Sequence, residues 1–328
     1  MGQNNELRED AKRIISRSIQ DMLPDSAVEH ALAGVDLPGS IYVAAFGKAA
    51  WQMANAAARI LGKRIRRGVV VTKYAHARGG IPGFQILEAG HPVPDENSVR
   101  GAEQIIELMK EAGEQDSIVL LVSGGGSALL EKPEEGLTLD DIQQVTEQLL
   151  QCGAAIQEIN VIRKRLSAVK GGKLAMMCRK ARIYQVVLSD IIDDNLEMIA
   201  SGPACADTST YEDVRRIKEK YNLRFSEKVE AALQRETPKR IDHVESVITG
   251  SVRELCRSAA RNAGELGYEP YILTASLDCE AREAGEFMAS IARSIGKVGQ
   301  AGFVKPCAII AGGETVVNLT GNGKGGRN

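Results

Sequence analysis

The sequence predicts an α/β protein with a Rossmann-like, doubly wound and mostly parallel sheet, followed by a second α/β domain. Its apolar runs are short and continuous rather than alternating, which is typical of strands buried on both faces. These runs alternate with helical segments of roughly 10–15 residues, the pattern of consecutive β-α-β units. Aromatic residues make up only 4% of the chain, whereas small aliphatic residues and glycine abound, a composition that suits α/β layers.

The strands are predicted where aliphatic runs lead into glycine, hydroxyl or charged residues. They cover residues 40–46, 68–74, 84–90, 117–123, 183–189, 246–250, 268–274 and 306–313. The helices are predicted where apolar residues recur at every third or fourth position. They cover residues 5–22, 49–61, 99–109, 139–151, 157–169, 210–221, 226–234, 251–266 and 279–295. Pro24 is expected to end the first helix, and Asp95 or Asn97 to cap the helix near 99.

Two domains are expected from a length of 328 residues. The best internal break is the charged, proline-containing stretch 235–246, so we place the N-terminal Rossmann-like domain at 1–240 and the start of the C-terminal domain at 241–328. The sequence ends in GNGKGGRN without the helix that should cover the second sheet, and this second domain is therefore expected to be incomplete.

Composition argues against several classes of partner. The formal net charge is −2, so no global field favours nucleic acid or an anionic membrane. No apolar stretch approaches the ~18 residues that cross a bilayer, and the polar N-terminus does not resemble a signal peptide. The six cysteines are scattered without a CxxC pair or zinc spacing, which favours a reducing, cytoplasmic setting.

Candidate site residues follow four predicted strands, because ligands of open α/β sheets bind outside the carboxyl ends of strands. They are Lys48 after 40–46; Ser123, Gly124, Gly125, Gly126 and Ser127 at the end of 117–123; Asp190 after 183–189; and Gly312, Gly313, Glu314 and Thr315 after 306–311. Glycine, lysine, carboxylate and hydroxyl groups of this kind bind phosphate, metal and polar substrates.

The glycine run at 124–126 has two interpretations. Backbone N–H groups in such a loop can surround an anion, although the loop is neither GxxxxGK[ST] nor GxGxxG. A tight turn from strand to helix explains the glycines equally well. Lys48 at a helix start is unfavourable for the helix dipole, a cost that a bound anion would offset, but it also fits an exposed lysine. His91 is interpreted as structural.

Further charged candidates lie elsewhere in the chain. The cations of residues 160–175 surround a predicted helix end capped by Gly171 and Gly172, where they could favour the dipole or bind phosphate; Lys170 is the cofactor-binding candidate among them. Asp190 could hold Mg²⁺ together with ligand phosphates. Arg327, in the glycine-rich loop 321–328, could bind carboxylate or phosphate with two hydrogen bonds.

Together these segments resemble the class II glycerate 2-kinases, whose C-terminal part is the MOFRL domain. The matching segments run in order from residue 44 to the last residue: AAFGKAAWQMA, GVVVTKY, EAGHPVPDENS, LVSGGGSALLEKP, EINVIRKRLSAVKGGKLA, VVLSDI, ASGPACADTST, SLDCEAREAG and GGETVVNLTGNGKGGRN. The resemblance implies two α/β domains with the active site in the cleft between them. The C-terminal domain of that family continues well past GGRN, which this sequence does not.

The resemblance also implies an activity and roles for residues. ATP, with Mg²⁺ or another divalent cation, would phosphorylate the 2-hydroxyl of D-glycerate, giving 2-phosphoglycerate and ADP. The important lysine and arginine of the family fall on Lys48 and Arg327. From the positions of the residues we add the hypothesis that the glycine loop holds the ATP phosphates and that Asp190 holds the metal or orients the hydroxyl. A homodimer is among the assemblies allowed.

The sequence leaves two other functions open. One is an NAD(P)H-dependent hydroxypyruvate reductase, against which the lack of GxGxxG argues. The other is a non-catalytic protein that binds a phosphorylated ligand.

Overall fold

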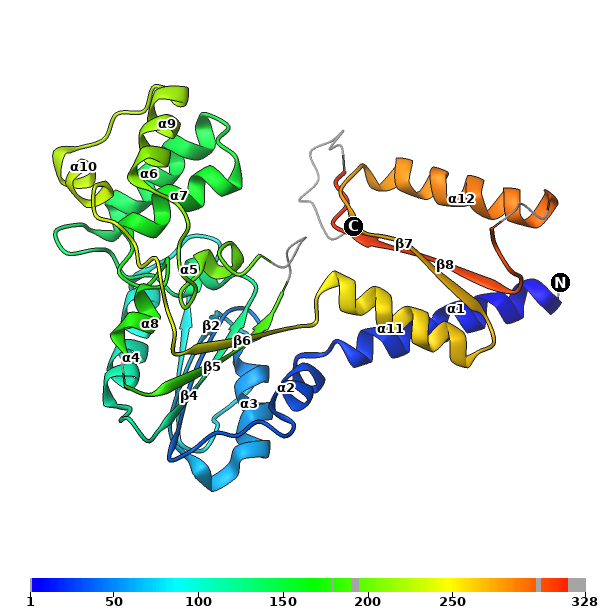
Figure 1. Ribbon diagram of the computed structural model, residues 1–328, viewed down its shortest axis with the longest axis horizontal. Helices are drawn as coiled ribbons and strands as arrows, with labels where there is room; N and C mark the ends of the chain where they lie inside the picture. The colour runs from blue at the N-terminus through cyan, green and yellow to red at the C-terminus, as the bar shows by residue number, and fades with distance from the viewer. Residues whose placement is uncertain (1, 179, 190–194, 299–301, 318–328) are drawn as a thin grey trace. The chain divides into compact units, whose positions relative to one another are not determined.

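The computed structural model of the chain describes residues 2–178, 180–189, 195–298 and 302–317 (Figure 1). These residues form two compact units. The larger unit contains residues 27–189 and 195–249, and the smaller unit contains residues up to 26 together with those from 250 onward.

The larger unit is built on a six-stranded sheet in the order β3-β2-β1-β4-β5-β6, in which every neighbouring pair is parallel. The strands are β1 (Ile41–Phe46), β2 (Ile65–Lys73), β3 (Phe84–Ala89), β4 (Ser117–Ser123), β5 (Arg182–Leu188) and β6 (Val244–Thr249). Every residue of β1 and β4 is buried, as their unbroken aliphatic runs predict. The prediction of a doubly wound parallel sheet is confirmed.

Helices cover both faces of this sheet (Figure 1). On one face, α2 (Pro24–Leu32) and α3 (Ala50–Leu61) pack against the central strands through a core that includes Val28, Met53 and Val43. On the other face lie α4 (Glu96–Glu111) and the short α8 (Lys173–Met177). Asp95 caps α4 as predicted, because its carboxylate accepts from the N–H of Ser98 at 3.1 Å.

Four further helices of the larger unit pack together around an apolar core of their own (Figure 1). They are α6 (Leu139–Gln151), α7 (Ile156–Leu166), α9 (Tyr211–Tyr221) and α10 (Glu227–Leu233). Ile142, Leu149, Ile162 and Leu233 are buried in this core. The apolar spacing predicted each of these helices, and the structure confirms them with small shifts in their ends.

The first helix ends at Asp21, before Pro24, as predicted. The prediction did not include α2, which Pro24 begins, because proline is well suited to the first position of a helix. One predicted helix end is wrong. The helix predicted over 157–169 ends at Leu166, where Ser167 adopts extended dihedral angles. Gly171 and Gly172 therefore do not cap it; Gly172, with φ of 82°, precedes α8 instead.

The smaller unit contains α1 (Gly2–Asp21), α11 (Val252–Glu265), β7 (Glu269–Leu277), α12 (Ala281–Val298) and β8 (Cys307–Gly313). β7 and β8 pair in parallel. The two units differ from the domains predicted with a boundary at 240 in two ways. The larger unit extends to Thr249, because β6 pairs with β5. In addition, α1 belongs to the smaller unit together with α11. Among the described residues, no helix has the length and apolar character required to cross a membrane.

Candidate active site

The candidate active site lies at the carboxyl ends of β1 and β4. The chain runs from β1 outward through β2 to β3 and then returns to β4 beside β1, so the strand order reverses between these two strands. In doubly wound sheets, ligands bind at such a switch point. Phe46 at the end of β1 pairs in register with Val122 of β4, so the segments that follow the two strands emerge side by side.

The segment after β1 is fixed against the end of β4 by its backbone. The N–H of Lys48 donates to the carbonyl oxygen of Gly124 at 2.8 Å, and the N–H of Ala49 donates to Ser123 Oγ at 3.1 Å. Gly47 has φ of 121°, and a Cβ at this position would lie 2.3 Å from Ser123 Oγ. Glycine at 47 therefore lets the two loops touch, and this contact places Lys48 beside the glycine run.

The glycine run forms a bare surface next to Lys48. Gly125 has φ of 82° and precedes the short helix α5 (Gly126–Leu129). A Cβ on Gly125 would lie 2.9 Å from the imidazole Nε2 of His91 and 3.2 Å from Lys48 Cε. No side chain fits there, so the backbone of the loop is directly presented to the lysine and the histidine. Both the turn and the anion-cradle interpretations account for part of this geometry.

A turn with strained backbone, residues 200–202, packs against the glycine loop. Ala200 and Ser201, neither of them glycine, have φ of 51° and 60°, and Gly202 follows with φ of 63°. Left-handed backbone at a non-glycine residue costs about 1–3 kcal/mol and persists where the surroundings impose it, often at functional sites. A Cβ on Gly126 would lie 2.7 Å from the Cβ of Ala200, so this turn and the loop are in close contact.

A chain of hydroxyl and amide groups connects this turn to α7. Ser127 Oγ lies 3.1 Å from Ser201 Oγ, which donates to Asn160 Oδ1 at 2.8 Å. Ser201 and Asn160 are both buried. The sequence gives a signal only for a turn at residues 200–203, because the contacts that bring Ser201, Asn160 and His91 to the loop are tertiary.

A small polar pocket adjoins Lys48. It has a volume of about 190 Å³, and its lining includes Lys48, His76 and Arg78. The imidazole Nδ1 of His76 lies 3.0 Å from the carbonyl oxygen of Lys48. Glu88 accepts hydrogen bonds from the N–H groups of His76 and Ala77 at 3.1 and 2.9 Å, which orders this turn and lowers the pKa of Glu88. The basic lining favours a small anion.

Lys170 lies outside this surface, contrary to its predicted role. Its ammonium donates to Glu131 Oε2 at 2.6 Å and to the carbonyl oxygen of Leu130 at 3.0 Å, and both charged side chains are 1% exposed. Burial lowers the pKa of Lys170, although Glu131 opposes this. The enclosed ion pair gives Lys170 a structural role, and the expected contact with a cofactor is not supported.

The neighbouring cations also have acidic partners, with one exception. Lys164 pairs with Asp207 at 3.0 Å, and Lys173 pairs with Glu134 at 2.5 Å. Arg165 is fully buried and pairs with Glu236 at 3.0 Å. Arg163 differs, since its Nε is a buried atom for which the described residues provide no hydrogen-bond partner.

The remaining predicted residues lie in the smaller unit or outside the described residues. Gly312 and Gly313 end β8, and a Cβ on Gly313 would lie 2.0 Å from the carbonyl oxygen of Leu277, so close strand packing requires this glycine. Glu314 continues the pairing, because its N–H donates to the same oxygen at 2.8 Å. Thr315 follows it. Asp190 and Arg327 lie outside the described residues.

Comparison with known proteins places the chain among relatives. Residues 10–234 match the family model described as a domain of unknown function, DUF4147. The D-glycerate 2-kinase of Thermotoga maritima is 49% identical over 322 residues, which are 98% of this chain and 77% of the relative. The glycerate 2-kinase of Pyrococcus horikoshii is 40% identical over 345 residues, again 98% of this chain and 77% of the relative.

The chain is also similar to a solved structure and to a relative with a different name. The crystal structure of the glycerate kinase from Thermotoga maritima superposes with a TM-score of 0.93 at 47% identity, covering 99% of this chain and 78% of that chain. A putative hydroxypyruvate reductase of Agrobacterium vitis is 38% identical over 334 residues, 98% of this chain and 74% of the relative.

Proposed function

This chain belongs to the glycerate kinase family, and from that premise we propose that it transfers a phosphoryl group from ATP to the 2-hydroxyl of D-glycerate. The products are 2-phosphoglycerate and ADP. One observation carries the proposal, the contact of Lys48 with a side-chain-free glycine loop at the switch point of the sheet. Phosphoryl transfer needs positioning and neutralised charge more than covalent participation by the protein.

The glycine loop is the proposed cradle for the ATP phosphates. Backbone N–H groups in a loop of successive turn conformations make a concave site for anions. The space that a Cβ on Gly125 would fill, bounded by His91 and Lys48, supports this role. Ser127 would remain oriented by its contact with Ser201.

Lys48 and the small basic pocket are the proposed binding site for the acid. A volume of about 190 Å³ suits a three-carbon acid better than a nucleotide. Lys48 and Arg78 would attract the carboxylate of D-glycerate, and Lys48, from its place beside Gly125, would also face the phosphoryl group. The same lysine would thus neutralise both reactants near the bond that forms.

A divalent cation fits this proposal without a dedicated protein cluster. Among the described residues, no group of three or more His, Cys, Asp or Glu could hold a metal ion. Mg²⁺ commonly uses only one or two carboxylates and completes its ligands with substrate phosphates and water. Asp190, from its place after a predicted strand, is the proposed carboxylate, and Arg327 is the proposed second cation on the strength of the resemblance. The ion would neutralise phosphate charge when bound.

The direct test is phosphorylation of D-glycerate by the purified protein with ATP and Mg²⁺. We expect ADP release that depends on D-glycerate, and a product whose phosphate is on the 2-hydroxyl by phosphorus and proton NMR. Phosphate on the 3-hydroxyl would refute the assignment. Oxidation of NADH by hydroxypyruvate without ATP would instead support a reductase, the activity suggested by the name of the Agrobacterium vitis relative.

A further inference from the structure

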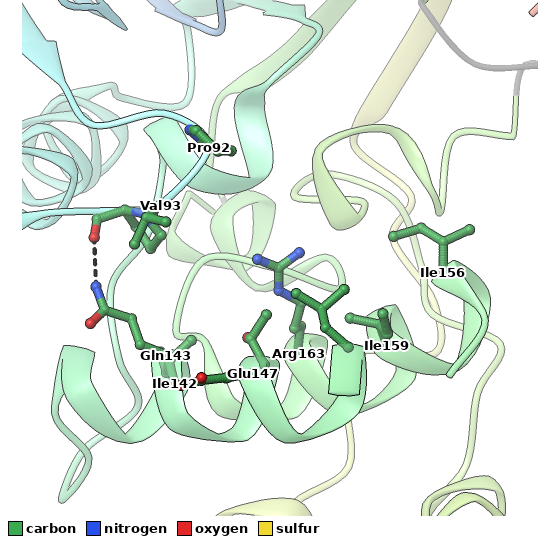
Figure 2. Close-up of a pocket in the computed structure, with 11 residues that line it drawn as sticks. Pro92, Val93, Ile142, Gln143, Glu147, Ile156, Ile159 and Arg163 are labelled. Carbon is green, nitrogen blue, oxygen red and sulfur yellow. Dashed lines mark hydrogen bonds between the residues drawn. The ribbon is translucent and has the colours of Figure 1, made fainter. Parts of the chain in front are cut away.

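A second cavity of the larger unit lies between the segment 92–94 and helices α6 and α7 (Figure 2). Its volume is about 540 Å³, within the roughly 300–1,000 Å³ typical of small-molecule sites. Pro92 and Val93 line it from the segment 92–94, Ile142 from α6, and Ile156 and Ile159 from α7. The mechanism proposed above does not use this cavity.

Its walls leave apolar surface open to solvent. Val93 is 59% exposed, Leu150 is 64% exposed and Ile156 is 54% exposed, although all three are large hydrophobic residues. Each lines the cavity. An apolar ligand surface placed between these walls would remove them from water, which is favourable by roughly 25 cal/mol per Å².

Two residues that line this cavity carry a buried polar atom without a hydrogen-bond partner among the described residues. Among the described residues, the buried side-chain atoms without a hydrogen bond are Thr146 Oγ1, Arg163 Nε and Arg165 Nε, and the first two residues line the cavity. Figure 2 shows the Arg163 guanidinium rising from α7 into the cavity, between Pro92 and Ile159. Burial lowers the pKa of Arg163, with Glu131 opposing the effect. A ligand that supplies hydrogen-bond acceptors would relieve this cost.

Two segments of the chain connect the lining of the cavity with the glycine loop. Pro92 lines the cavity, and the ring of His91, one residue earlier, faces Gly125. On the other side, α7 carries Ile159 and Arg163 in the cavity wall and Asn160, which reaches Ser127 through Ser201. A molecule with a phosphate tail at the glycine loop could therefore place its other end here.

We propose that this cavity holds the adenine and ribose of ATP. This assignment rests on the proposed function, which puts the ATP phosphates on the glycine loop. The flat base lies between the Pro92–Val93 wall and the isoleucines of α6 and α7. The N–H groups of Arg163 donate to ring nitrogens or ribose oxygens, and the hydroxyl of Thr146 meets a second polar group of the nucleoside.

The main test compares ATP with tripolyphosphate, a probe that has the phosphates but no nucleoside. In Arg163→Met, which keeps the length and loses the donors, we expect the Kd and KM for ATP to rise about tenfold or more. The Kd for tripolyphosphate and the KM for D-glycerate should stay within about twofold. Arg215→Met, at an exposed arginine of α9 paired with Glu212, is the matched control and should leave all four constants unchanged.

Photolabelling with 8-azido-ATP provides a readout that needs no variant. Peptides containing residues 92–94 or 142–163 should carry the label, and excess ATP should remove it. Label confined to other peptides would overturn the assignment. The assignment would also be overturned if the wild-type protein phosphorylates D-glycerate and Arg163→Met has the same KM for ATP. That outcome would leave the proposed function intact. A wild-type protein that binds no ATP would refute both.

Discussion

At the scale of single residues, Lys48 is held in place by its backbone. Its N–H donates to Gly124, and its carbonyl oxygen accepts from Thr72 Oγ1 at 3.4 Å and lies 3.0 Å from the His76 ring. Truncation of the lysine therefore leaves these backbone hydrogen bonds in place.

We predict that Lys48→Ala lowers kcat for glycerate phosphorylation by about 10²–10³-fold, the cost of losing one group that stabilises developing charge. The side chain is exposed, so the free energy of unfolding should change by less than about 0.5 kcal/mol. Lys63→Ala, at another exposed lysine, should alter neither quantity. Coupled measurement of ADP release and urea denaturation check both values. A kcat within tenfold of wild type would exclude Lys48 from the reaction.

Gly125 allows a test of the glycine loop by one added methyl group. Alanine there must adopt φ near 82° and place its Cβ 2.9 Å from the His91 ring. We predict that Gly125→Ala costs about 1–2 kcal/mol of stability from the left-handed backbone. It should also raise the KM for ATP, because His91 or the loop must move.

Gly80→Ala is the matched control, since nothing lies within 4 Å of its Cβ position and its φ is not in the left-handed region. It should have wild-type stability and kinetics. Thermal unfolding and ATP titrations of the two variants provide the comparison. Wild-type ATP kinetics in Gly125→Ala would argue that the glycines serve only as a turn.

At the scale of elements, the sequence was sufficient to predict the sheet and two parts of the candidate site, Lys48 and the glycine loop. Unbroken aliphatic runs predict β1 and β4 because strands buried on both faces need no polar side, and the residues after each run then identify Lys48 and the glycine loop. Ser201 and Asn160 could not be found this way, because they reach Ser127 through contacts between distant segments. The buried ion pair of Lys170 with Glu131 could not be foreseen for the same reason.

Helix α7 is anchored at its start by Glu158. This carboxylate accepts from the N–H of Ala155 at 3.0 Å, from Lys220 Nζ at 2.8 Å and from the Tyr221 hydroxyl at 2.7 Å. The hydrogen bond from Lys220, followed by that from Tyr221, lowers the pKa of Glu158 from 4.5 to about 2. Because the pKa is lowered in the folded state, the resulting stabilisation is complete above pH 4.5 and disappears as the pH falls toward about 2.

We therefore predict that Glu158→Gln unfolds more easily than wild type at neutral pH, and that the difference shrinks between pH 4.5 and about 2. Urea denaturation at several pH values measures it. Glu212→Gln, which breaks only an exposed pair with Arg215, should follow the wild-type curve. A Glu158→Gln difference that grows on acidification would contradict the sign of this argument.

At the scale of the whole molecule, the smaller unit joins segments that are far apart in the sequence. α1 lies alongside α11, more than two hundred residues later (Figure 1). The Tyr268 hydroxyl donates to Asp10 at 2.8 Å, and Asn262 Nδ2 donates to Ser18 Oγ at 3.2 Å. The predicted boundary at 240 missed this arrangement, because helical periodicity identifies an apolar face but not its partner.

We predict that deleting residues 1–23, which removes α1 and leaves Pro24 to begin α2, destabilises the smaller unit selectively. Hydrogen exchange should show lost protection in α11, whose Asn262 and Ser258 are buried beside α1, while amides in β1 and β4 stay protected. Tyr268→Phe, which removes one hydrogen bond to α1, should give a small loss in the same segment. Equal loss of protection in β1 and β4 would mean that the two units unfold together, because exchange in a strand buried in the larger sheet requires that sheet to open.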